Sequence, residues 1–210
     1  MMPFKSISIL SGPSFSNEVS HRLPTAVTQA TKDKKEFENI SKLIPNKEFR
    51  IYYSNDLIGT QIGGALKNIY AIAAGIAEGL NLGENAKSAL ISRSFAEMAR
   101  YAKKFKADKN TLFGLSGLGD LILTCSSKNS RNTQFGIKLA SSKYDNFLDL
   151  LKSQEVTEGY YTVKAVYNIS QKKNIDMPIM ESVYNILYKQ HDLKEELSNL
   201  LSRPITEEKI

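Results

Sequence analysis

The sequence has few of the residues that build covalent cross-links and metal sites. Its 210 residues include one cysteine, Cys125, two histidines and no tryptophan. A single cysteine excludes a disulfide within the chain and a cysteine-rich zinc site, and neither His21 nor His191 has a second ligand at metal-binding spacing. We therefore expect no metal site, a buried structural thiol at Cys125, and histidines that lie at the surface or bind neighbouring groups.

The chain also lacks a secretory signal pattern near its first residues and any long run of like charge. Together with the single cysteine, this favours a reducing, cytoplasmic setting. The net charge of +6 and the pI near 9.2 raise the question of a nucleic-acid partner. However, the lysines are dispersed, with short clusters only at residues 32–35 and 103–106. Solvated helix faces explain these clusters, and we expect no nucleic-acid partner.

One apolar stretch carries a single charge. Residues 57–77, LIGTQIGGALKNIYAIAAGIA, contain only Lys67, and their apolar residues recur at three- and four-residue spacing. The pattern predicts a long helix that is buried on nearly every side together with Lys67. Burial of an unpaired ammonium can lower the pKa of a lysine toward the range in which it exchanges protons, which makes Lys67 a candidate general base.

Two other interpretations of this stretch compete with catalysis. Lys67 could reach water by snorkelling past Gly63 and Gly64, and the helix alone favours neither this interpretation nor a catalytic one. A membrane span is disfavoured, because a lysine at the centre of a bilayer costs about 2.5–3.5 kcal/mol. We expect no membrane span.

The first part of the chain alternates strand and helix signals. Residues 6–10, 24–30 and 48–54 predict strands, and residues 32–44 predict an amphipathic helix that a proline follows. A strand, a crossover helix and a further strand form the unit of a parallel sheet. We therefore expect a small α/β part over residues 1–54.

Helical periodicity replaces the strand signals from residue 55 onward. Asn55 or Asp56 can cap the long apolar helix. Further helices are expected at residues 84–106, 120–125, 131–140, 160–171, 178–190 and 193–201. The second expected domain, residues 55–210, is therefore all-helical.

Two glycine-containing stretches are candidate parts of a site. SGPSF follows the first strand, where open α/β sheets bind ligands at the carboxyl ends of their strands; Gly12 admits a ligand to the backbone, and Ser14 offers a hydroxyl and a helix start. GLSGLGD predicts a tight loop that presents Asp120 at a helix start, where it can pair with a buried ammonium. The alternative for SGPSF is a plain turn with a capping serine. The alternative for GLSGLGD is an ordinary capping aspartate.

The tripeptide SRN opens a predicted helix. The hydroxyl of Ser130, the amides of the helix start and the guanidinium of Arg131 can together cradle a phosphate dianion. A serine cap with a surface arginine is the alternative. The stretch VTEGYYT places Glu158 before a glycine and a helix, which alone indicates little.

In combination, these stretches resemble the NAD(P)-dependent glycerol-3-phosphate dehydrogenase family in its bacterial form. The resemblance covers nearly all 210 residues and rests on the following segments in family order: LSGPSFSNEV, LPTAV, GGALKNIYAIAAGIAEGL, LGENAKSALISRSFAEM, TLFGLSGLGDLILTC, SRNTQFG, TEGYYT, MPIMESVYNILY and LLSRP. It implies part of a Rossmann-like sheet followed by an all-α C-terminal domain. The implied reaction interconverts sn-glycerol 3-phosphate and dihydroxyacetone phosphate with NAD or NADP, which supplies glycerophospholipid synthesis.

The resemblance also implies roles for particular residues. Lys67 falls on the catalytic lysine of the family and Asp120 on the carboxylate beside it. The implied substrate contacts are Gly12, Ser14, Lys67, Asp120, Ser130, Arg131 and Asn132. The implied cofactor contacts are Ser16, Arg131, Val156 and Glu158. Two departures stand out, since Ser16 replaces a usual alanine and Ser94 a usual glycine.

The glycine-rich dinucleotide loop with which the family begins does not occur in this sequence. We therefore expect the truncated chain to show no turnover alone and to regain activity with a complete N-terminal half, which a separate chain could supply. A homodimer is a further expected partner arrangement. A noncatalytic remnant of the enzyme is the main alternative, and a basic helical nucleic-acid-binding module is a weaker one. The β-hydroxyacid dehydrogenases expect an asparagine where this chain has Ala71, so the first resemblance is preferred.

Overall fold

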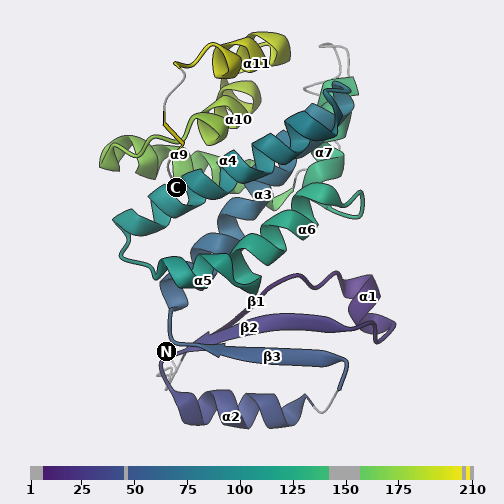
Figure 1. Cartoon of the computed structure of the whole chain (residues 1–210), viewed down its shortest axis with the longest axis vertical. Coiled ribbons are helices and arrows are strands. Elements are labelled where there is room, and N and C mark those ends of the chain that lie inside the picture. Colours follow the sequence, from purple (N-terminus) through teal and green to yellow (C-terminus); the bar gives the residue numbers. More distant parts are fainter. Residues whose placement is uncertain (1–6, 45–46, 142–156, 205–206, 209–210) are drawn as a thin grey trace.

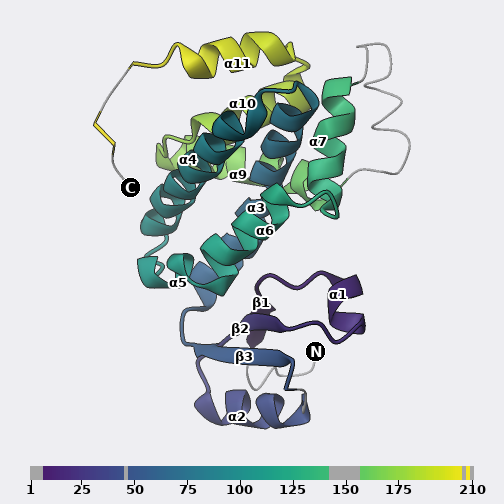
Figure 2. The same cartoon turned by 45° about the vertical axis from the view of Figure 1, so that its right-hand side comes forward.

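The computed structural model describes residues 7–44, 47–141, 157–204 and 207–208. Figure 1 shows a small sheet at one end of the molecule, with helix α2 (Lys34–Leu43) on its outer side and the long helices stacked on its other side. The view in Figure 2 shows the same order of layers. This arrangement confirms the expected fold, a small α/β part followed by a mostly helical part.

Two strands form the expected parallel unit. β2 (Thr25–Thr31) and β3 (Phe49–Ser54) pair in parallel with Val27 opposite Ile51, and α2 connects them. Asp33 caps α2 by accepting hydrogen bonds from the first backbone N–H groups of the helix. The strand–helix–strand pattern of the sequence is therefore confirmed.

The first strand runs in the opposite direction. β1 (Ser8–Ser11) pairs with β2 in antiparallel orientation, with Ser8 opposite Thr31 and Ser11 opposite Thr28. The loop after β1 therefore leaves the sheet at the end where β2 and β3 begin, which is opposite to their carboxyl ends. The expectation that SGPSF follows a strand is confirmed, but its placement at the shared carboxyl edge of a parallel sheet is wrong.

Helix α3 (Leu57–Gly79) forms the centre of the helical part. Asp56 caps it by accepting a hydrogen bond from the backbone N–H of Gly59 at 2.9 Å. Its second half is buried, whereas Ile58 and Ala65 in its first half are exposed. The prediction of burial on nearly every side is therefore correct only beyond Lys67.

Close packing of α3 depends on glycine. A Cβ atom on Gly75 would lie 2.0 Å from the carbonyl oxygen of Thr133, and one on Gly63 would lie 2.1 Å from that of Ser116. Because no side chain separates the backbones there, α3 touches α7 (Arg131–Ser141) and the turn before α6 directly. These contacts fix the distance between the helices that carry the candidate residues.

Most of the remaining helices of the described residues pack around α3. The remaining helices are α1 (Ser16–Ser20), α4 (Gly83–Lys104), α5 (Lys109–Phe113), the π-helical turn η1 (Leu115–Gly119), α6 (Asp120–Ser126), α9 (Glu158–Lys173), α10 (Pro178–Lys189) and α11 (Leu193–Leu201). Of these, α1 lies beside the sheet and α11 packs on α10. The helices expected from periodicity are confirmed with ends shifted by a few residues. The short elements α5 and η1 were not predicted, since each is too short to show a period.

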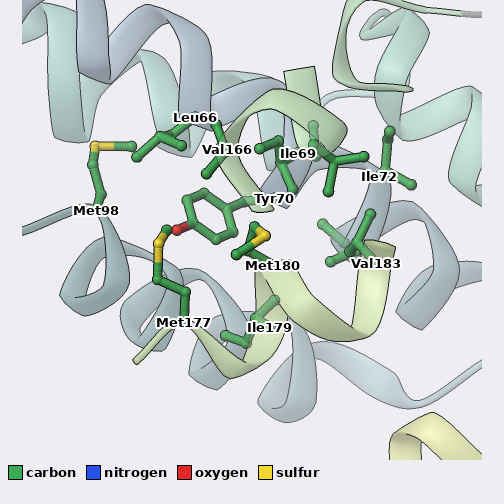
Figure 3. Packing of buried hydrophobic residues seen from close by; sticks show 14 of the residues in the cluster. Leu66, Ile69, Tyr70, Ile72, Met98, Val166, Met177, Ile179, Met180 and Val183 are labelled. Atoms are coloured by element: carbon green, nitrogen blue, oxygen red, sulfur yellow. The ribbon is translucent and has the colours of Figure 1, made fainter. Parts of the chain in front are cut away.

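The core surrounds α3 and takes buried side chains from α4, α5, α6, α7, α9 and α10. Figure 3 shows the ring of Tyr70 among Met98, Val166, Met177 and Met180, and all of these side chains are buried. Ser94 of α4, at which the resemblance implied glycine, is fully buried, so the helix packing accommodates its hydroxymethyl group. Within the described ranges, no helix has the length and hydropathy to cross a membrane.

Candidate functional site

Lys67 lies on the side of α3 that faces Asp120. The lysine Nζ is 2.5 Å from the carboxylate Oδ2, and the side chains of Lys67 and Asp120 are 22% and 3% exposed. The sequence suggested a buried, unpaired ammonium or a lysine that snorkels to water. The structure instead shows a half-buried ion pair, in which the almost fully buried carboxylate is compensated by the ammonium.

The chain before Asp120 folds differently from the predicted tight loop. Leu115–Gly119 forms the π-helical turn η1, and Asp120 continues it as the first residue of α6. Gly117 packs so closely that a Cβ would lie 2.1 Å from the carbonyl oxygen of Leu112. π-Helical turns often mark functional sites, and here the turn brings a carboxylate against α3.

The ion pair lines a hollow of about 550 Å³. Nine of the ten site residues expected from the sequence line it: Gly12, Ser14, Ser16, Lys67, Asp120, Ser130, Arg131, Asn132 and Glu158. The tenth, Val156, lies outside the described residues. The hollow therefore joins segments from the α/β part, from α3, from α6 and from the starts of α7 and α9.

The loop after β1 forms one wall of the hollow. Gly12 has a φ of +148° and packs against Val27 of β2, where a Cβ would come within 3.0 Å of the backbone. The hydroxyl of Ser14 donates a hydrogen bond to the carbonyl of Gly12 at 2.9 Å. Ser14 does not cap α1, since the N-cap is Phe15, so the expectation that it starts a helix is wrong.

The start of α7 forms the facing wall. The Oγ atom of Ser130 accepts a hydrogen bond from the backbone N–H of Thr133 at 3.2 Å, which is a helix cap as the sequence suggested. Arg131 extends from the first turn and forms an ion pair with Glu158 of α9. Arg131 and Glu158 are 76% and 53% exposed on their side chains. An exposed pair of this kind is weak, so a phosphate dianion can compete for the guanidinium.

Asn132 connects three helices beneath this wall. Its side-chain amide donates to Oδ1 of Asn68 on α3 at 3.0 Å, and its Oδ1 accepts from the backbone N–H of Gly159 at 3.0 Å. A Cβ atom on Gly159 would lie 2.7 Å from Oδ1 of Asn132. The side chain of Asn132 is buried, so these bonds fix the starts of α7 and α9 against α3.

Comparison with known proteins identifies the family. Residues 56–198 match the family described as NAD-dependent glycerol-3-phosphate dehydrogenase C-terminus. The chain belongs to this family. The glycerol-3-phosphate dehydrogenase (NAD(P)+) of Solidesulfovibrio magneticus is 46% identical over 202 residues, which are 96% of this chain and 61% of that protein. The corresponding protein of Francisella tularensis is 43% identical over 209 residues, which are 99% of this chain and 62% of that protein.

Solved structures of glycerol-3-phosphate dehydrogenases have the same fold. That of Coxiella burnetii is 38% identical with a TM-score of 0.88, covering 94% of this chain and 61% of that one. That of Plasmodium falciparum is 26% identical with a TM-score of 0.83, covering 98% of this chain and 59% of that one. The chain thus spans about three fifths of the length of its glycerol-3-phosphate dehydrogenase relatives.

Sequence reasoning did not select several polar residues that line the hollow, namely Ser11, Asn68, Thr124 and Asn129. Asn68 lines the hollow beside Lys67 and accepts the hydrogen bond from Asn132. The available signal was its position as the second polar residue in the centre of an apolar helix. Its partner comes from a helix 64 residues further along the chain, so the residue pattern around Asn68 gave no reason to select it.

The structure also shows the surroundings of Cys125, His21 and His191, for which the sequence predicted no role in the site. Cys125 is buried, as expected, and burial raises the pKa of its thiol to about 12. His191 lies 2.7 Å from Glu196, and Nδ1 of His21 lies 2.7 Å from the carbonyl of Asn17, so both histidines have partners. Within the part of the chain that the structure describes, no group of three or more His, Cys, Asp or Glu residues is arranged to hold a metal ion.

Proposed function

We propose that this chain supplies the substrate site and the proton-transfer group of a glycerol-3-phosphate dehydrogenase. The proposed reaction interconverts sn-glycerol 3-phosphate and dihydroxyacetone phosphate. The observation that carries the proposal is the Lys67–Asp120 pair, with 2.5 Å between Nζ and Oδ2, in the same hollow as the start of α7. The hollow offers an acid–base group at one point and an anion site at another, as a phosphorylated alcohol requires.

The lysine is the proposed proton-transfer group. Asp120 orients the ammonium of Lys67 through the ion pair. In reduction, Lys67 gives its proton to the oxygen of the C2 carbonyl as that oxygen gains charge. In oxidation, the neutral amine takes the proton of the C2 hydroxyl, and the hydrogen at C2 leaves as hydride. A bound nicotinamide supplies or accepts that hydride.

The start of α7 is the proposed phosphate site. The hydroxyl of Ser130, the first N–H groups of α7 and the guanidinium of Arg131 lie on the same wall of the hollow. The positive end of the helix dipole favours a dianion there. Gly12 and Ser14 are the proposed contacts from the opposite wall. The phosphate thereby anchors the substrate so that its C2 oxygen can reach Lys67.

The residues present fit a nicotinamide cofactor next to this substrate. A hollow of about 550 Å³ is large enough for a drug-sized ligand and exceeds what a three-carbon phosphate fills. Ser16 and Glu158 lie on its exposed rim, and together with Arg131 they are the proposed contacts to NAD or NADP. The loop of residues 12–16 belongs to the α/β part, which we propose is a portion of the dinucleotide-binding domain, with residues 55–210 as the substrate domain. We further propose a cytoplasmic setting.

Ligand binding by the chain tests the proposal. Isothermal titration with dihydroxyacetone phosphate is expected to give one site per chain, and unphosphorylated dihydroxyacetone is expected to give none. Arg131→Ala is expected to weaken phosphate binding by about tenfold, because it removes a charge-assisted contact. Arg93→Ala, an exposed arginine of α4, is the matched control and is expected to leave binding unchanged. Equal binding of the phosphorylated and unphosphorylated compounds would contradict the proposed site.

A further inference from the structure

A buried carboxylate lies away from the candidate site, in the core of the helical part. Glu97 is in the middle of α4 and is 1% exposed. Its Oε1 accepts a hydrogen bond from the backbone N–H of Ile179 at 2.6 Å, and its Oε2 accepts one from that of Met180 at 3.1 Å. Both N–H groups belong to the first turn of α10. A fully buried carboxylate is costly, so an arrangement with two donors indicates a specific role.

The first turn of α10 has no cap of its own. Its N-cap is Met177, which makes no side-chain cap bond, and Pro178 at the first helical position has no N–H. The N–H groups of Ile179 and Met180 would therefore be buried and unpaired without Glu97. The carboxylate of α4 thus replaces the missing N-cap from another helix, and its charge also suits the positive end of the α10 dipole.

The same carboxylate reaches the helix that carries Lys67. The hydroxyl of Tyr70 on α3 donates a hydrogen bond to Oε2 of Glu97 at 3.4 Å. Figure 3 shows the ring of Tyr70 enclosed by apolar side chains, and Tyr70 itself is 0% exposed. Tyr70 lies three residues after Lys67, about one helical turn. One carboxylate therefore connects α4, the start of α10 and the turn of α3 that presents the lysine.

The titratable and charged groups near Glu97 come from α4, from α3, from α6 and from the segment before α10. Desolvation raises the pKa of Glu97 to about 7, while the two backbone N–H groups and Arg100 oppose the rise and Asp176 adds to it. Arg100 follows Glu97 on α4 and donates to the carbonyl of Asp176, in the segment before α10. On the α3 side, burial and Glu97 raise the pKa of Tyr70, and Cys125 of α6 lies near enough to add to that rise.

We propose that Glu97 is a positioning residue for the site: by holding the start of α10 and the hydroxyl of Tyr70 together, it fixes the turn of α3 that presents Lys67. The kinetic part of this inference rests on the proposed function. Glutamine can accept only one of the two N–H bonds, because its amide nitrogen only donates, and protonated Glu97 accepts the second one only weakly through its hydroxyl oxygen. Loss of the charge therefore loosens the connection to α3.

The kinetic test uses the joined enzyme, which is this chain joined to the N-terminal part of the Solidesulfovibrio magneticus relative that the match leaves uncovered. Glu97→Gln is expected to lower kcat for dihydroxyacetone phosphate by about tenfold at pH 8.5, because a small displacement of the acid–base group is costly. KM is expected to change by less than about twofold, since the proposed phosphate contacts on α7 are untouched. At pH 5.5 the two proteins are expected to have nearly equal kcat. Glu84→Gln, the other glutamate of α4 and an exposed one, is the matched control and is expected to match the unsubstituted enzyme.

A second measurement does not depend on activity. In chain labelled with ¹³C at lysine Cε, the Lys67 signal, assigned by its absence in Lys67→Ala, is expected to shift between pH 6 and pH 8. The shift is expected to disappear in Glu97→Gln and in Tyr70→Phe, which keeps the ring and removes only the hydroxyl that bonds to Glu97. Should Glu97→Gln fold poorly, Tyr70→Phe carries both measurements, with an expected loss of about threefold in kcat at unchanged KM.

These measurements separate the inference from the proposed function. The joined enzyme could be inactive while the Lys67 signal still shifts between pH 6 and pH 8 and loses that shift in Glu97→Gln. This result would overturn the proposed function and support the positioning role. An active enzyme in which both substitutions leave kcat, its pH profile and the Lys67 signal unchanged would overturn the positioning role alone. A loss of stability with unchanged kcat and an unchanged Lys67 signal would likewise overturn it, since that result describes a purely structural residue.

Discussion

The ammonium of Lys67 lies 2.5 Å from the carboxylate of Asp120, although the two residues are 53 positions apart in the chain. Asp120 is almost fully buried, and its Oδ1 also accepts a hydrogen bond from the hydroxyl of Thr124 at 3.3 Å. Because both side chains are largely shielded from water, each charge would lack compensation if the other were removed. The pair therefore links the stability of the fold to the chemistry of the hollow.

Removal of the carboxylate is expected to destabilise the fold. Asp120→Asn is expected to lower the free energy of unfolding by about 1–3 kcal/mol, less than for a fully buried pair because Lys67 is 22% exposed. Lys67→Met should recover part of this loss when both substitutions are combined, since it removes the ammonium left without a partner. Urea denaturation of the single and double variants measures this coupling. Strictly additive losses would show that the pair contributes no interaction energy.

The exposed pair at the start of α7 is expected to limit anion binding. Glu158→Gln frees Arg131 from its ion pair and is expected to tighten the binding of inorganic phosphate by about two- to fivefold, as a surface pair is worth up to about 1 kcal/mol. Titration calorimetry at low and high salt measures the effect, which should shrink as ionic strength rises. Glu195→Gln, at an exposed position of α11, controls for the change in net charge. Weaker phosphate binding in Glu158→Gln would assign Glu158 to the anion site itself.

The contact between α3 and α7 is expected to tolerate no side chain. Gly75→Ala would place a Cβ atom 2.0 Å from the carbonyl oxygen of Thr133 and force the two helices apart, which should cost about 2–3 kcal/mol of unfolding free energy. Gly119→Ala is the comparison, because a Cβ there meets only ordinary contacts at 3.7 Å and beyond. Chemical denaturation distinguishes them. Similar stability of both variants would mean that the helices can separate without cost.

The buried Glu97 is expected to make stability depend on pH. Because its folded-state pKa of about 7 lies above the ordinary value of 4.5, the folded chain holds a proton that the unfolded chain releases between these values. Its contribution to the free energy of unfolding is therefore present at low pH and is lost as pH rises toward 7, by up to about 3 kcal/mol. The stability difference between the original chain and Glu97→Gln, followed by urea denaturation from pH 4.5 to 8, should fall over this range. A difference that is constant, or that grows with pH, would contradict the assignment.

Much of the architecture could be predicted because local pattern and tertiary structure agree. The apolar period of α3 and the strand–helix–strand pattern of β2, α2 and β3 each determine their own element. The direction of β1 could not be predicted in this way. It depends on how residues 12–24 return the chain to β2, and their only helix, α1, is five residues long.

The pairing of Lys67 with Asp120 was predictable, because one side chain implies the chemistry of its partner. A lone lysine in an apolar helix calls for a carboxylate, and Asp120 after a glycine-rich stretch supplied one. Glu97 and Asn68 were not predictable, because their partners are backbone N–H groups and an amide brought together from other helices. The π-helical form of Leu115–Gly119 was also not predictable, because its glycines are compatible both with a loop and with close helix packing.

The most direct test of the account is the oxidation of NADH with dihydroxyacetone phosphate by the joined enzyme and its Lys67→Ala variant. We expect the joined enzyme to turn over and Lys67→Ala to lower kcat by about 10²–10⁴-fold, the range that a positioned acid–base group contributes. Lys103→Ala, which changes an exposed lysine of α4, should leave kcat unchanged. Full turnover by Lys67→Ala would contradict the proposed role of the lysine and with it the central claim.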